Sequence, residues 1–177
     1  MRRKWLSTAA AAGTLLVLLS SCATVREKTD AYLMAESPAL TRPIAADLRS
    51  LEIVSNDLPL SDDYPLLRDS LTAIASRHGF ALSTGTDAPY AVDFVLHERS
   101  YVVDLATSSS IMAVMNVKPS GGDGSTAARV IYTAVVPDSV QSFYQVNAIA
   151  EKLFVALEKA LDDRAAKEKA AATAAAP

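Results

Sequence analysis

The sequence predicts an α+β fold, in which a mixed or antiparallel sheet of about five strands packs against two main helices. Two periodicities carry this prediction. Between residues 90 and 136, apolar residues recur at every second position, which is typical of strands. On either side of that stretch they recur every three or four positions, which is typical of a helix with one buried face. The predicted order is strand, helix, four strands and a second helix.

The predicted domain opens with a strand, a helix and a returning strand. Residues 51–54 form a short apolar run with β-branched side chains and are the first strand. The helix that follows is capped by Asp62 or Asp63 and ends at Gly79, and residues 80–83 return as a strand. The apolar face of this helix consists of Leu67, Leu71, Ile74 and Ala75.

Three further strands are expected to form an antiparallel meander. They cover residues 90–101, 109–118 and 127–136, and the glycine-rich turn 119–124 joins the last two. The same turn does not fit a phosphate-binding loop, because no Lys followed by Ser or Thr stands at the required spacing. We therefore interpret it as a hairpin turn.

The strand at 109–118 is apolar on both of its faces. Met112 and Val114 lie on the face opposite to its main apolar set. Either the helices of the domain cover both faces, or this second face is an open patch. In the second case Met112 and Val114 form a possible interaction face for a partner protein or a lipid tail.

The last helix is the clearest element of the pattern. Ser142 followed by Gln145 resembles a capping box, and apolar residues then recur at helical spacing as far as Leu161. We expect a single α+β domain over residues 49–161, a tether over residues 22–48, and an Ala/Lys/Glu-rich low-complexity tail at 162–177 into which the helix frays.

Residues 1–21 have the pattern of a cleaved export signal. Arg2, Arg3 and Lys4 form a cationic start, and an apolar run follows from residue 5 to residue 19. This run is shorter than the roughly 20 residues that a membrane-spanning helix needs. We therefore expect the signal to be removed from the mature protein.

Leu19, Ser20, Ser21 and Cys22 resemble the lipobox of bacterial lipoproteins, and the resemblance covers residues 1–22. It implies that the thiol of Cys22 receives a diacylglycerol, that cleavage occurs before Cys22, and that the new amino group is acylated, palmitate being one such chain. Two or more chains give stable anchoring. Because Ala23 follows the cysteine, the resemblance implies the outer membrane, facing the periplasm. The alternative is an ordinary secretory signal with a leftover cysteine.

Charge and length restrict the possible partners. The chain has 17 basic and 20 acidic residues, and loss of the three basic residues of the signal leaves 14 against 20. This acidic balance argues against nucleic acid as a partner, because phosphate binding needs a concentrated basic face. Cys22 is the single cysteine, so the mature chain forms no internal disulfide.

No catalytic signature is present in the sequence. His78 and His97 are the only histidines, and neither stands in a zinc-binding motif. His78 is expected to interact with the end of a helix, and His97 to be solvated or paired across strands. Asp93, Glu98 and Asp104 are carboxylates of one strand region that we do not assign as an acid and base pair. We predict no enzyme, no cofactor and no metal site.

The order of elements over about residues 49–161 is similar to that of small envelope-assembly accessory lipoproteins, such as the lipopolysaccharide-assembly lipoprotein and the lipoprotein activators of peptidoglycan synthases. This resemblance implies a non-catalytic accessory or scaffold subunit that binds a cell-envelope protein. The first alternative is a carrier that holds a lipid or small apolar ligand between helix and sheet. The second is an envelope hydrolase, which would need clustered polar groups in a deep pocket.

Overall fold

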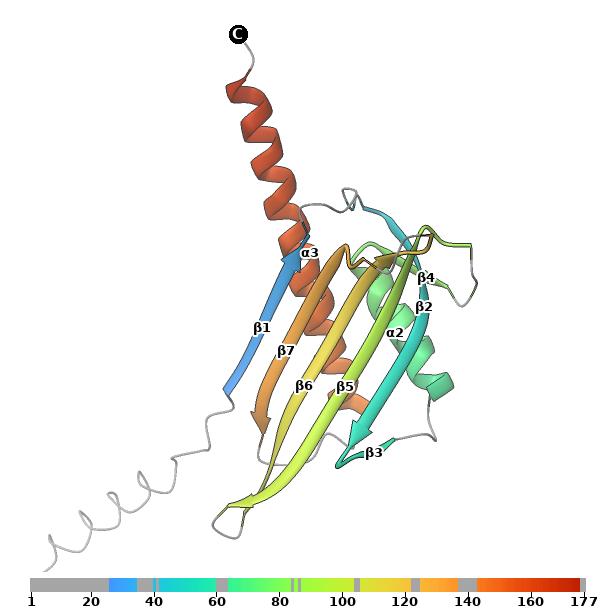
Figure 1. Cartoon of the computed structure of the whole chain (residues 1–177), viewed down its shortest axis with the longest axis vertical. Coiled ribbons are helices and arrows are strands. Elements are labelled where there is room, and N and C mark those ends of the chain that lie inside the picture. The colour runs from blue at the N-terminus through green and yellow to red at the C-terminus, as the bar shows by residue number, and fades with distance from the viewer. Residues whose placement is uncertain are drawn as a thin grey trace, which may run out of the picture.

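The computed structural model describes residues 26–34, 40, 42–59, 64–83, 85, 87–103, 106–121, 125–136 and 143–175. In these residues, seven strands form one mixed sheet and two helices pack on one of its faces (Figure 1). In chain order the elements are β1 (Arg26–Leu33), β2 (Ile44–Ser55), β3 (Leu58–Pro59), α2 (Tyr64–Arg77), β4 (Phe80–Ser83), β5 (Tyr90–Val103), β6 (Ala106–Pro119), β7 (Ala128–Val136) and α3 (Phe143–Ala174).

The sheet combines an antiparallel part and a parallel part. Across it the strands follow the order β1-β7-β6-β5-β2-β3, and β4 pairs with β2 outside this path. The neighbours among β5, β6, β7 and β1 are antiparallel, whereas β2 is parallel to both β4 and β5. Parallel neighbours need a long crossover connection, which α2 supplies between β2 and β4.

The core lies between the sheet and the two helices, on the face that we call the core face. Strand residues at alternate positions point into it, as in β6, where Ile111, Ala113, Met115 and Val117 are at most 3% exposed. From the other side, α3 contributes Leu153 and Leu157, which have no exposed surface. The largest fully buried side chains include Phe80, Phe94, Phe154, Ile44, Leu71, Leu96 and Met115.

The α+β class is confirmed, as is the antiparallel meander, but the strand count and order differ from the prediction. The sheet includes β1 and β3, which the sequence did not reveal. β1 is an edge strand whose residues are exposed or half-buried, so its sequence lacks a clear apolar alternation. β2 begins at Ile44 rather than at Leu51. An irregularity between Leu48 and Ser50 interrupts its two-residue period, so the apolar pattern did not reveal the first part of this strand.

Both ends of the chain also differ from the expected tethers. Residues 22–48 were predicted to lie outside the domain, yet β1 and the first residues of β2 belong to the sheet. α3 does not fray after Leu161 but continues to Ala174, since Ala, Lys and Glu all favour helix. Its last turns project beyond the sheet (Figure 1). Gly122, Gly124 and Ser142 lie outside the described residues.

Methionines on the two faces of β6 provide a test of the fold. Met115 is fully buried and Met112 is 47% exposed. We expect Met115→Ala to lower the free energy of unfolding by about 2–5 kcal/mol, because it leaves a cavity in the core. Met112→Ala, the matched control, is expected to change it by no more than about 0.5 kcal/mol. Urea unfolding measures both values, and equal losses would contradict the assignment of the two faces.

Candidate functional site

The second face of the sheet, which we call the open face, is not covered by α2 or α3. Both helices lie behind the sheet in Figure 1, and the open face is turned toward the viewer. Met112 and Val114 lie on this face at the middle of β6, Met112 being exposed and Val114 half-buried. Two arrangements were considered for this strand, with both faces covered or with one face open. In the described residues its second apolar face is open.

The strand register extends this apolar surface into a row across three strands. Val114 is opposite Val95 of β5 on one side and opposite Ile131 of β7 on the other. All three are half-buried, and Met112 adjoins them two residues along β6. Side chains opposite one another in a sheet lie about 4.5–5.5 Å apart at Cβ, so the three β-branched residues are in contact range. We call Val95, Met112, Val114 and Ile131 the central patch.

Polar and charged pairs border the central patch. Lys118 Nζ lies 2.8 Å from Asp93 Oδ2, and Arg129 Nε donates to Asn116 Oδ1 at 2.8 Å. On β1, Lys28 and Asp30 form an ion pair at 2.7 Å. An apolar centre within a polar margin is the usual composition of a protein interface.

An open hollow of about 330 Å³ lies next to the central patch and is lined by residues of β2, β5 and β6. Val54, His97, Arg99, Ser110 and Met112 are among its lining residues. His97 is exposed and is opposite Met112 in the register, so it belongs to the open face. The hollow makes this part of the open face concave rather than flat.

A small polar cluster occupies the core face at the same end of the sheet. Glu98 is 2% exposed and accepts a hydrogen bond of 2.8 Å from Ser55 Oγ. Ser109, which has no exposed surface, shares a hydrogen bond of 3.0 Å with Ser100. Asp93 lies on the open face, away from Glu98, and Asp104 is outside the described residues. The structure therefore does not bring Asp93 and Glu98 together as an acid and base pair.

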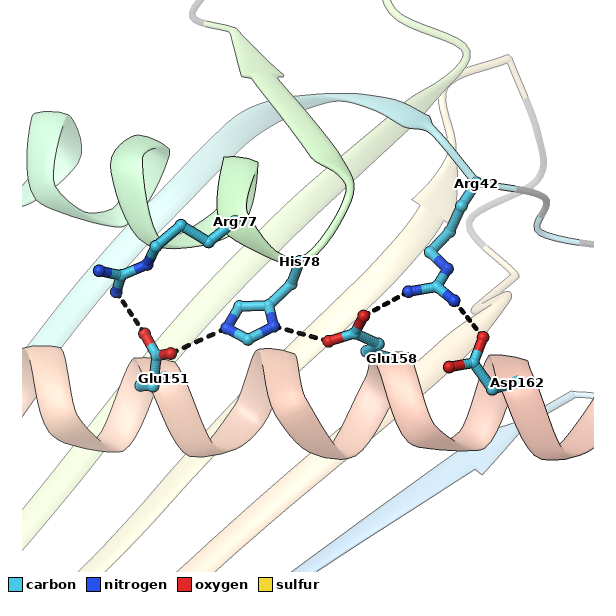
Figure 2. A network of polar contacts seen from close by, with 6 residues as sticks. All are labelled: Arg42, Arg77, His78, Glu151, Glu158 and Asp162. Atoms are coloured by element: carbon cyan, nitrogen blue, oxygen red, sulfur yellow. Dashed lines mark hydrogen bonds and ion pairs between the residues drawn. The ribbon is translucent and has the colours of Figure 1, made fainter.

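A set of ionic contacts between α3 and its neighbours surrounds His78. This His78 network consists of Arg42, Arg77, His78, Glu151, Glu158 and Asp162 (Figure 2). His78 Nδ1 lies 2.7 Å from Glu158 Oε2, and Nε2 lies 2.9 Å from Glu151 Oε1. Arg77 extends the chain of contacts at Glu151, and Arg42 extends it at Glu158 and Asp162. The network joins the end of α2 and the segment before β2 to one side of α3.

Gly79 positions the histidine of this network. α2 ends at Arg77, and Gly79 has a φ of 79°, the left-handed conformation that closes helices. A Cβ at Gly79 would lie 3.2 Å from Cδ of Arg42, so a side chain there would also press on the arginine. The sequence correctly placed the end of this helix at Gly79. It did not identify Glu151 and Glu158, although their seven-residue spacing puts both on one side of α3.

The two glutamates favour the charged form of His78. Burial lowers the pKa of His78, but the hydrogen bonds to Glu158 and Glu151 and their charges raise it by more, so it lies above 6.5. The hydrogen bond from His78 is the main cause that lowers the pKa of Glu151, and likewise that of Glu158, below 4.5. An imidazolium donates from both nitrogens, which matches an acceptor on each side.

The remaining predictions concern membrane attachment and metal binding. Cys22 and the signal lie outside the described residues. Among the residues that are described, no helix is both long and apolar enough to cross a membrane. In the same part of the chain, no three His, Cys, Asp or Glu side chains are grouped to hold a metal ion.

Comparison with known proteins gives distant likenesses in structure and none in sequence. No protein-family model and no curated protein sequence matches the chain. Two structures of the PelC dodecamer from Paraburkholderia phytofirmans align with TM-scores of 0.44 and 0.42 at 12% identity, covering 75% and 77% of this chain and 98% and 97% of that chain.

Two further solved structures are similar at the same level. A Xanthomonas campestris protein of family model DUF330 aligns with a TM-score of 0.39 at 13% identity, over 77% of this chain and 94% of that chain. A minor lipoprotein from Acinetobacter baumannii aligns with a TM-score of 0.34 at 13% identity, over 71% and 92%. At these values the likenesses carry no argument about function.

The His78 network predicts how stability depends on pH. Because the pKa of His78 is raised in the folded state, its contribution to stability is fully present below pH 6.5. That contribution is lost as the pH rises through the raised pKa. Because the pKa values of Glu151 and Glu158 are lowered, the contribution of these carboxylates to stability is present above pH 4.5. It is lost as the pH falls through the lowered values. We therefore expect the contribution of the network to the free energy of unfolding to be greatest between pH 4.5 and 6.5.

Chemical denaturation across this pH range tests the assignment. His78→Gln is expected to remove the decline in stability on the alkaline side, because glutamine does not titrate. His97→Gln replaces the other histidine, which is exposed on the open face, and is expected to leave the decline in place. An unchanged decline in His78→Gln would show that His78 does not cause it.

Proposed function

We propose that this protein is a lipid-anchored, non-catalytic accessory subunit of the cell envelope that binds an envelope protein through its open sheet face. The observation that carries the proposal is the central patch. A sheet with helices on one face leaves its other face to solvent, and that face is normally polar along alternate residues. Here the middle of the open face is apolar over three neighbouring strands.

The composition of the open face supports a protein partner. Val95, Val114 and Ile131 offer branched apolar surface, and Met112 adds a flexible side chain that adapts to the shape of a partner. The ion pairs at the margin supply polar groups that fix orientation. Contiguous exposed apolar surface within a polar rim marks interaction sites.

Anchoring rests on the lipobox. Acylation at Cys22 would hold the protein at a membrane surface, and Ala23 favours the outer membrane on its periplasmic side. A membrane anchor concentrates the protein near other envelope components. A modest interface then suffices for binding, because tethering raises the effective concentration of the partner.

The carrier alternative receives no support from the packing. A ligand held between helix and sheet would need space there. In the described residues the middle of that layer is filled by side chains such as Phe94, Met115 and Leu153, which are at most 1% exposed. A hollow of about 560 Å³ does lie between the end of β1 and α3, but it is open to solvent and its α3 side carries charged side chains such as Asp163 and Lys167. An open, partly charged hollow does not suit an apolar ligand, so lipid carriage stays the weaker proposal.

Site-specific photocrosslinking in cells tests the partner. We expect a photoreactive amino acid at Met112, which is 47% exposed, to give one adduct of defined mass with an envelope protein. The matched control is Val155 on α3, which is 46% exposed and is expected to give no such adduct. Immunoblotting and mass spectrometry identify the adduct. Equal adducts at both positions, or none at Met112, would contradict the proposal.

Replacement of the cysteine tests the anchor. Cys22→Ser removes the thiol that would be acylated, so we expect the variant to leave the membrane fraction or to remain unprocessed. Fractionation and intact mass measure both effects. A mature variant that stays membrane-bound with no loss of acyl mass relative to the unaltered protein would exclude lipidation at this residue.

A further inference from the structure

The distance between the proposed anchor and the fold is short. β1 begins at Arg26, so only three residues separate it from Cys22. Four steps of extended chain reach at most about 14 Å. This step rests on the lipid anchor of the proposed function. An anchor at Cys22 would therefore hold the sheet close to the bilayer surface rather than at the end of a long tether.

The register shows which end of the sheet lies nearest to the proposed anchor. Arg26 is opposite Val135 of β7, Val135 is opposite Ser110 of β6, and Ser110 is opposite Arg99 of β5. These residues mark one end of the sheet, which we call the anchor end. It is opposite to the end at which the C-terminal part of α3 projects (Figure 1).

A two-stranded ribbon extends from the anchor end. Beyond Arg99, β5 continues for four residues to Val103, still paired with β6 as far as Ala106. At about 3.3 Å per residue this overhang is about 13 Å. The overhang therefore matches the reach of the chain from Arg26 to Cys22. Even a fully extended chain therefore carries the acyl attachment no farther from the sheet than about the paired end of the ribbon.

The side chains of the anchor end fit a lipid headgroup region. Of the eight large apolar residues exposed in the described part of the chain, four lie here, namely Leu58, Tyr101, Val102 and Val135. Val102 is 70% exposed, the highest value among the eight. Tyr at the membrane interface places its ring against the acyl boundary and its hydroxyl in water.

The charges of the anchor end suit the same surface. Arg26 and Arg99 are exposed, and cations are attracted to anionic lipids. The ion pair between Arg99 and Asp57, at 3.3 Å, has both side chains more than 70% exposed, so it holds the arginine only weakly.

We propose that the anchor end docks on the lipid bilayer surface, with Tyr101 and Val102 of the ribbon entering the headgroup region beside the acylated Cys22. The contact is small, and its strength comes from the anchor, which keeps the ribbon at high local concentration next to lipid. The ribbon and the anchor together hold the strands upright on the membrane. The open face then stands at a steep angle to the bilayer and remains accessible to a protein partner.

Depth-dependent fluorescence quenching tests this docking. The only tryptophan of the chain is Trp5, which is in the predicted signal, so a tryptophan introduced into the mature protein reports alone. Tyr101→Trp places it on the ribbon, where the tyrosine is 40% exposed. Tyr32→Trp is the matched control, since Tyr32 is 48% exposed at the far end of β1. Val102→Trp is a second reporter on the ribbon.

The lipidated protein is reconstituted in vesicles of phosphatidylethanolamine and phosphatidylglycerol that carry a spin label near the headgroup. We expect Tyr101→Trp and Val102→Trp to shift their emission to the blue and to lose about half of their intensity, and Tyr32→Trp to change little. Equal quenching at the two ends, or no quenching on the ribbon of a protein whose mass shows the acyl chains, would overturn the docking alone. A mass without acyl chains would overturn the anchor and the docking with it.

Discussion

α3 packs across the core face of β1, β7 and β6 through apolar side chains, and Leu153 and Leu157 at the middle of the helix have no exposed surface. β6 therefore presents Ile111, Ala113 and Met115 to the helix. By the alternation of a strand, it must present Met112 and Val114 on the other side. With both helices on the core face, those residues have no cover within the described chain. The open face is thus a direct consequence of where α3 binds.

Charged contacts hold the flanks of α3 to the rest of the domain. On one side the His78 network ties α3 to α2 and to the segment before β2. On the other side Lys152 pairs with Glu27 of β1, which also accepts a hydrogen bond of 3.2 Å from Tyr132. Burial and the charge of Glu27 raise the pKa of Tyr132 to about 12, so the phenol stays a donor. Apolar packing buries one face of α3 against the sheet, and these charged contacts on its two sides favour one rotation of the helix about its own axis.

The sequence reveals the elements whose apolar period is strong and misses those that tertiary pairing creates. The α2, β5, β6, β7 and α3 segments each bury a regular set of side chains, and all were predicted. β1 has four charged residues in its eight and forms because β7 offers it an edge. For the candidate site, Met112 and Val114 were visible as a doubly apolar strand. Val95 and Ile131 were not, since their position beside Val114 depends on the strand register. The partners of His78 likewise depend on a contact between residues more than 70 positions apart.

α3 gives the molecule a long axis with two different ends. After Leu161 the helix continues for thirteen residues to Ala174, and nearly all of them are exposed. At 1.5 Å per residue this segment adds about 20 Å beyond the last core contact. A group carried at the end of α3 would therefore be displaced from the sheet by a stiff spacer, on the side away from the start of β1 (Figure 1). The exposed end of α3 and the start of β1 thus lie at opposite ends of the molecule (Figure 1), so groups attached to them would be kept apart by the length of the sheet and of this helical segment.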